Sequence, residues 1–160
     1  MKPKHLYTIG YEGHSWDSFA QRLVAARVNI LIDVRELPLS RKRGFSKRAL
    51  ALALADINIA YAHMPTLGCP KPIRDRLKAG GDWRTYVLGF DKHLATQDAA
   101  VHELAKIASE SATCLLCFEA DFNHCHRSIV GRAAVTAGAP SLAHITQEKV
   151  VPEIPLRRIA

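Results

Sequence analysis

The sequence predicts a single α/β domain in which a mostly parallel sheet carries helices on both faces. Short apolar runs alternate along the chain with segments whose apolar residues recur at helical spacing. A length of 160 residues suits one domain with a sizeable core. A content of 48% hydrophobic and 23% charged residues is typical of a globular chain and excludes a disordered one. We therefore expect one domain over residues 1–160, with an irregular tail from about residue 150.

The first half of the chain supplies three predicted strands and two predicted helices. The strands are the apolar runs 6–9, 29–35 and 59–64. The helices follow Ser15 and Ser46, because a serine side chain can accept a hydrogen bond from the first turn of a helix.

Residues 67–81 interrupt this alternation. The segment contains two prolines, three glycines and a cluster of basic side chains. These residues break regular structure, so we expect an irregular surface excursion with the character of a lid.

The second half begins with predicted helices over 83–94 and 98–109. An apolar run over 114–118 predicts a buried strand, and a polar loop and a helix that stops at Gly138 follow it. A last strand is expected over 141–145. Because crossovers between parallel strands are right-handed, the loops after successive strands gather at one edge, where α/β proteins bind ligands.

The strand and helix over 113–138 contain the strongest candidates for catalysis. Cys125 lies at a predicted helix start beside two histidines and an arginine, an environment that lowers a thiol pKa. Glu119 and Asp33 lie near strand ends and could act as a general base or orient a ligand hydroxyl. Structural roles remain open for all three residues. Cys125 could be a packing residue, Glu119 a helix cap, and Asp33 an ion-pair partner of Arg35.

A second group of side chains suits binding a phosphate or stacking on a base. Phosphate sites typically contain guanidinium or ammonium groups and the polar groups at a helix start. Base-binding sites typically contain an aromatic ring. The candidates are Tyr11, Arg35, Ser40, Lys47, His126, Arg127 and Ser128.

A metal site is a weaker alternative. Cys114 and Cys117 lie on one predicted strand, where their odd spacing directs them to opposite faces. Cys117, Cys125 and a flanking histidine could surround an ion, yet no complete four-ligand set has workable spacing. We therefore expect no metal and no cofactor.

A net charge of +7 and a pI near 9.5 favour an anionic partner, either a small molecule or a nucleic acid. Much of the excess lies in residues 41–48. No apolar run is long enough to cross a bilayer, and the apolar stretch at the start is too short for a signal peptide. We expect a cytoplasmic protein with reduced cysteines and no membrane partner. The oligomeric state stays open.

Four stretches, TIGYEGHS, IDVRELPLSRKRGFSK, IAYAHMPTLG and LLCFEADFNHCHRS, occur in this order. They resemble a large, mainly prokaryotic family, the domain of unknown function 488. The likeness covers about residues 7–145 and implies a compact α/β domain without an agreed activity. A looser similarity links LIDVRE at 31–36 to rhodanese-type sulfurtransferases. Nine residues, 118–126, separate Cys117 from Arg127 here, too many for the tight anion-binding loop of those enzymes.

Together these features favour a small enzyme that binds a phosphate-containing or nucleotide-like ligand at the carboxyl edge of its sheet. One alternative is a non-catalytic nucleic-acid-associated module that uses the basic segment 41–48. A second alternative is sulfurtransferase-like thiol chemistry. Saturable small-molecule binding favours the enzyme, and salt-sensitive binding to long polyanions favours the module.

Overall fold

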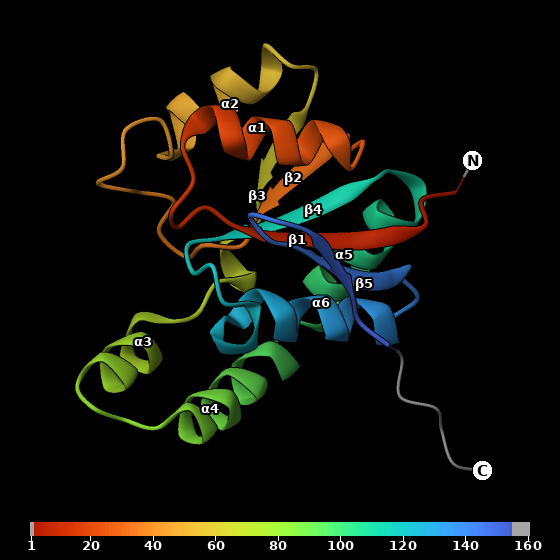
Figure 1. The fold of residues 1–160 in the computed structure, drawn as a ribbon. Coiled ribbons are helices and arrows are strands. Elements are labelled where there is room, and N and C mark those ends of the chain that lie inside the picture. The colour runs from red at the N-terminus through yellow and green to blue at the C-terminus, as the bar shows by residue number, and fades with distance from the viewer. Residues whose placement is uncertain (1, 155–160) are drawn as a thin grey trace.

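The protein folds into a six-stranded sheet flanked by helices, as a computed structural model that describes residues 2–154 shows (Figure 1). The strands are β1 (His5–Gly10), β2 (Ile30–Asp33), β3 (Ala60–His63), β4 (Thr113–Cys117), β5 (Ser141–Ile145) and β6 (Val150–Pro152). The helices are α1 (Trp16–Ala25), α2 (Lys47–Ala55), α3 (Lys71–Lys78), α4 (Trp83–Ala95), α5 (Asp98–Glu110) and α6 (His126–Thr136). Two short 3-10 helices, η1 (Pro65–Leu67) and η2 (Phe122–His124), follow β3 and β4.

The strand order is β3-β2-β4-β1-β5-β6, in which the first five strands are parallel and β6 is antiparallel to β5. Helices α1 and α2 cover one face of the sheet, and α5 and α6 cover the other (Figure 1). The predicted α/β class with a mostly parallel sheet is therefore confirmed. No helix within residues 2–154 is long and apolar enough to cross a membrane.

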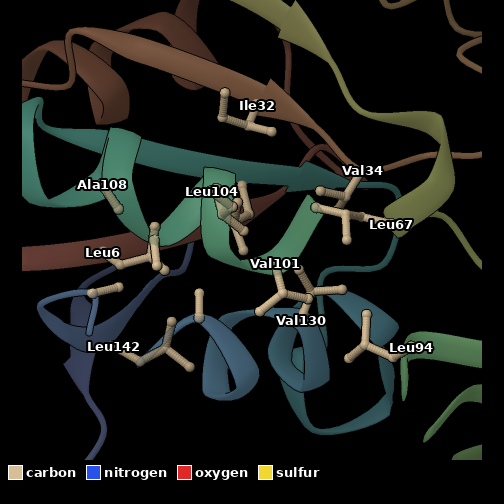
Figure 2. Close-up of a cluster of buried hydrophobic side chains, with 14 of the residues drawn as sticks. Leu6, Ile32, Val34, Leu67, Leu94, Val101, Leu104, Ala108, Val130 and Leu142 are labelled. Atoms are coloured by element: carbon tan, nitrogen blue, oxygen red, sulfur yellow. The ribbon is translucent and has the colours of Figure 1, made fainter. Parts of the chain in front are cut away.

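The sheet separates two hydrophobic cores, because successive strand side chains point to opposite faces. In β4, Cys114 and Leu116 pack with the helices α1 and α2, while Leu115 packs on the other side. That second core joins strand residues to α4, α5 and α6 (Figure 2). Its fully buried members include Leu6, Ile32, Phe90, Leu104 and Val130.

Two segments predicted to be irregular contain regular structure. Residues 71–78 form α3, which has no fully buried side chain; its apolar signal is the single pair Ile73 and Leu77, which packs partly buried on the core and lies among prolines and glycines. Pro72 is compatible with the first turn, where backbone N–H groups have no partner within the helix. Residues 150–152 form the edge strand β6, and Pro152 is tolerated at an edge. The remaining part of the predicted tail, residues 155–160, lies outside the described residues.

One of the two predicted serine caps is present. The Ser15 hydroxyl accepts a hydrogen bond from the Ser18 N–H and caps α1. Ser46 occupies the cap position of α2, but its hydroxyl bonds instead to the backbone of Ser40, accepting from the N–H and donating to the carbonyl. Ser46 thus closes the basic loop on itself.

His144 on β5 connects the sheet to the loop that follows β4. Its Nδ1 lies 2.7 Å from the Thr8 hydroxyl, and its ring stacks on Phe122 with centroids 4.1 Å apart. Burial lowers the pKa of His144, and the Arg127 and Arg132 side chains lower it further against the opposing effect of Glu153. The imidazole is therefore neutral in the folded protein near neutral pH.

We expect the stability contributed by neutral His144 to be lost on acidification. The imidazole of the unfolded chain has a pKa of about 6.5. As the pH falls below that value, the unfolded chain binds a proton before the folded protein does, so the free energy of unfolding decreases. Denaturant unfolding at several pH values between about 7.5 and 5 measures this decrease. The free energy of unfolding should begin to fall near the reference pKa of about 6.5.

The His144→Asn variant cannot titrate and should show a shallower pH dependence than the wild type. His102→Asn is the matched control, because His102 is exposed on α5. An unchanged pH dependence in His144→Asn would contradict the interpretation.

Candidate functional site

A cavity of about 430 Å³ opens where β1, β2 and β4 end. The chain leaves β1 for α1 on one face of the sheet and leaves the neighbouring β4 for α6 on the other face (Figure 1). Connections that diverge from adjacent parallel strands leave a crevice between them, which is the usual ligand site of open α/β sheets. The segments after the strands contribute Tyr11, Arg35, Glu36, Leu37, Leu39, Phe118, Glu119 and His124 to its wall.

The opposite wall comes from α3, α4 and the segment between η1 and α3. It contains Cys69, Arg74, Leu77, Lys78, Trp83 and Tyr86. An Arg74–Glu36 ion pair of 2.8 Å connects α3 to the segment after β2. The rings of Trp83 and Tyr86 stack with centroids 4.6 Å apart. None of these side chains was a sequence-based candidate, because only the packing of α3 and α4 against the strand ends brings them to the cavity.

Asp33 lies beneath the cavity and fixes the orientation of Arg35. The Asp33 carboxylate is fully buried and accepts hydrogen bonds from Arg35 Nε at 2.9 Å and Nη2 at 2.8 Å. It also accepts one from the Tyr61 hydroxyl, which together with burial raises the Tyr61 pKa. The third guanidinium nitrogen, Arg35 Nη1, lies 3.5 Å from the Tyr11 hydroxyl on the cavity wall. The carboxylate therefore preorganises Arg35 and does not itself line the cavity.

A cluster of two thiols and one imidazole lies at the inner end of the cavity. The ligand atoms of Cys117, Cys125 and His126 all lie within 4.8 Å of one another, and all three residues are buried. His126 Nε2 lies 2.6 Å from the Val34 carbonyl oxygen, to which it donates, so Nδ1 faces the sulfurs. Cys117 Sγ lies 3.6 Å from that Nδ1 and 3.1 Å from Glu119 Oε2.

These groups shift one another's ionisation. Burial opposes ionisation of Cys125, yet hydrogen bonds from Cys117 and His126 and the nearby Arg127 guanidinium hold its pKa below the usual range. Burial and the neighbouring Cys125 raise the pKa of Cys117. Burial and Cys125 also raise the pKa of Glu119. Cys125 is thus the most acidic thiol of the cluster, whereas Cys117 is the sulfur that lines the cavity.

Arg127 and Ser128 face the protein and not the cavity. Arg127 is fully buried, and its guanidinium donates to the Glu119 and Ala120 carbonyls and to the Thr8 hydroxyl. The Ser128 hydroxyl donates to the Phe122 carbonyl. Both side chains hold the loop between β4 and α6 in place.

The cavity brings together four of the sequence-based candidates, Tyr11, Arg35, Glu119 and His126. Three further candidates contact these residues without lining the cavity: Asp33 bonds to Arg35, Cys125 lies beside His126, and Arg127 donates to the Glu119 carbonyl. Ser40 and Lys47 lie on the basic loop and at the start of α2, outside the cavity lining.

The fold and the site define a single-domain α/β protein with a cavity at the carboxyl edge of a mostly parallel sheet. The family model for the domain of unknown function DUF488 matches residues 15–134. The chain belongs to this family, as its motifs predict. No curated protein and no solved structure shows significant similarity to the chain.

Proposed function

We propose that the protein is a small enzyme whose cavity binds a phosphate-containing ligand that also carries an aromatic ring, as a nucleotide does. One observation carries this proposal: a single cavity combines three cationic side chains with a stacked aromatic pair and a thiol–imidazole cluster. The cations are Arg35, which is paired with Asp33, Arg74, which is paired with Glu36, and Lys78. A volume of about 430 Å³ suits a ligand of that size.

The cations support an anionic end of the ligand. Asp33 holds the Arg35 guanidinium in one orientation, so Arg35 can contact a phosphate without first losing side-chain freedom. Lys78 is exposed at the end of α3 and lines the same cavity. Guanidinium and ammonium groups form strong, charge-assisted hydrogen bonds with phosphate oxygens.

The aromatic side chains support a planar end of the ligand. Trp83 stacks on Tyr86, and the His124 ring lies edge-on to Trp83 with centroids 5.3 Å apart. Across the cavity, Leu37 and Leu39 are exposed apolar side chains. A base can stack on such a surface with little dependence on its identity. The reacting end of the ligand then lies toward Glu119 and the thiol–imidazole cluster.

The test is direct binding of a panel of nucleoside mono- and diphosphates, with inorganic phosphate included. Saturable binding of one panel member is expected by calorimetry. Lys78→Met and Trp83→Ala should each weaken it about 10-fold, since a charged hydrogen bond or a stacked base contributes on the order of 1–3 kcal/mol. Lys71→Met is the matched control, because Lys71 is exposed on the same helix but does not line the cavity.

A non-catalytic nucleic-acid-associated module is the second candidate, favoured by the basic loop. Arg41, Arg43, Lys47 and Arg48 are all exposed. Such a module would bind long polyanions without sequence preference, and its affinity would fall steeply with salt. Two results together would overturn the enzyme proposal in favour of the module. The protein would show no saturable nucleotide binding, and Lys78→Met and Trp83→Ala would leave its binding to long polyanions unchanged.

A further inference from the structure

We infer that Cys117, Cys125 and His126 form a zinc-binding site at the inner end of the cavity, with one coordination position open toward the ligand. This inference goes beyond the proposed function and does not depend on it, since zinc binding can be measured without any organic ligand.

The separations within the cluster suit tetrahedral coordination. Zinc–sulfur bonds of about 2.3 Å and zinc–nitrogen bonds of about 2.0–2.1 Å place two such ligand atoms roughly 3.6 Å apart at the tetrahedral angle. The measured distance from Cys117 Sγ to His126 Nδ1 is 3.6 Å. Cys125 Sγ completes a set whose members all lie within 4.8 Å of one another. Within residues 2–154 no other group of three such ligand atoms gathers as closely.

The surroundings of His126 are those of a metal ligand. A coordinating imidazole usually donates its second N–H to a carbonyl or carboxylate, which fixes the ring and its tautomer. His126 Nε2 donates to the Val34 carbonyl oxygen and directs Nδ1 toward the sulfurs, where it coordinates after releasing the proton that it donates to Cys125 in the absence of an ion. The ligands also lie on rigid elements, with Cys117 at the end of β4 and His126 at the start of α6. The site is therefore held in shape before an ion binds.

The fourth position faces the cavity. Cys117, His126 and Glu119 line the cavity wall, and Glu119 Oε2 lies 3.1 Å from Cys117 Sγ. Three protein ligands with an open fourth position are typical of catalytic zinc sites, whereas structural sites are closed by four. Glu119, a water molecule or a donor atom of the cavity ligand can occupy that position. The cavity is also the route by which the ion enters.

The charges of the buried groups balance once the ion is bound. Two thiolates and the Glu119 carboxylate carry three negative charges, and a zinc ion with the Arg127 guanidinium carries three positive charges. Each thiol binds as a thiolate and releases its proton to solvent. The sequence offered Cys117, Cys125 and a flanking histidine only as a weaker alternative and predicted no metal, because no second short-spaced ligand pair accompanies them; the distances within the cluster are the reason to propose the site.

The experiment is a cobalt and zinc titration of the protein purified under reducing conditions and stripped with a chelator. We expect one equivalent of Co²⁺ to bind, with a near-ultraviolet thiolate-to-cobalt band and the visible bands of a tetrahedral site, and Zn²⁺ to displace it. Cys117→Ser and Cys125→Ser should each weaken binding at least about 100-fold. Cys69→Ser is the matched control, since Cys69 lines the same cavity outside the cluster.

A second measurement on the wild type covers the case in which the serine variants fail to fold. Zn²⁺ should slow alkylation of Cys117 and Cys125 and leave Cys69 unaffected. The inference fails if the wild type takes up no cobalt, if folded Cys117→Ser or Cys125→Ser binds it as the wild type does, or if zinc leaves both cluster thiols unprotected. A Cys117–Cys125 disulfide in the reduced preparation would also overturn it.

Discussion

Replacing Arg127 with methionine should lower the free energy of unfolding by about 3 kcal/mol or more. The Arg127 guanidinium is fully buried and donates to the carbonyls of Glu119 and Ala120 and to the Thr8 hydroxyl. Methionine fills a similar volume but donates nothing, so the partly buried Glu119 and Ala120 carbonyls lose this donor and the Thr8 hydroxyl keeps only His144 as a partner. Each such loss costs roughly 1–3 kcal/mol. Urea unfolding followed by circular dichroism measures the change.

Arg132→Met is the matched control on the same helix. The Arg132 side chain is 50% exposed and pairs with Glu153 at the surface, so its loss should cost at most about 1 kcal/mol. If the two variants unfold at the same urea concentration, Arg127 is not the tie that holds the loop after β4.

The second large effect is expected for Gly10→Ala. Gly10 is the last residue of β1, and a Cβ built there overlaps the backbone carbonyl oxygen of Glu119. Backbone atoms cannot rotate away as a side-chain tip can, so β1 and the loop after β4 must separate. We expect a loss of about 3 kcal/mol in the free energy of unfolding, at the upper end of overpacking effects. Scanning calorimetry should show this loss as a lower melting temperature.

Gly89→Ala provides the comparison, because a Cβ at Gly89 meets only the Ile73 side chain at an ordinary 3.6 Å. Gly89 lies inside α4, where alanine is the better helix former by about 1 kcal/mol. The melting temperature of Gly89→Ala should equal or exceed that of the wild type. Equal melting temperatures for Gly10→Ala and the wild type would mean that the close approach of β1 to Glu119 is not required.

Most of the fold could be predicted because its elements carry their own pattern. The strands β2 and β4 are apolar except for Asp33 at the end of β2 and Thr113 at the start of β4, and α5 shows the apolar spacing of a helix with one buried face. Helix α3 was predicted to be irregular, since its apolar signal is one pair, Ile73 and Leu77, among prolines and glycines that usually break helices. The edge strand β6 is short and contains a proline, and its pairing with β5 is a tertiary contact.

The residues of the candidate site also fall into those that local sequence could place and those that depend on tertiary packing. Tyr11, Arg35 and Glu119 could be placed at one edge because the ends of parallel strands meet there. Trp83 and Lys78 could not, because they reach the cavity only through the packing of α3 and α4. Local sequence also favoured Cys125 over Cys117, since a helix start acidifies a thiol. It could not show that the sulfur facing the cavity is the one that ends β4.

The weak attachment of α3 has a consequence for how the cavity exchanges its contents. Ile73 and Leu77, both partly buried, pack against the second core, and an ion pair with Glu36 and a hydrogen bond from Arg74 Nε to the Cys69 carbonyl complete the attachment of α3. Segments with so little buried apolar surface open at a small fraction of the global unfolding free energy and exchange their amide hydrogens early. The part of the cavity wall that α3 contributes is therefore expected to be less protected than the part formed by the strand ends. Opening of this eight-residue helix would remove Arg74, Leu77 and Lys78 from the cavity wall and uncover part of the second hydrophobic core, so the exchange of the cavity's contents is linked to that core.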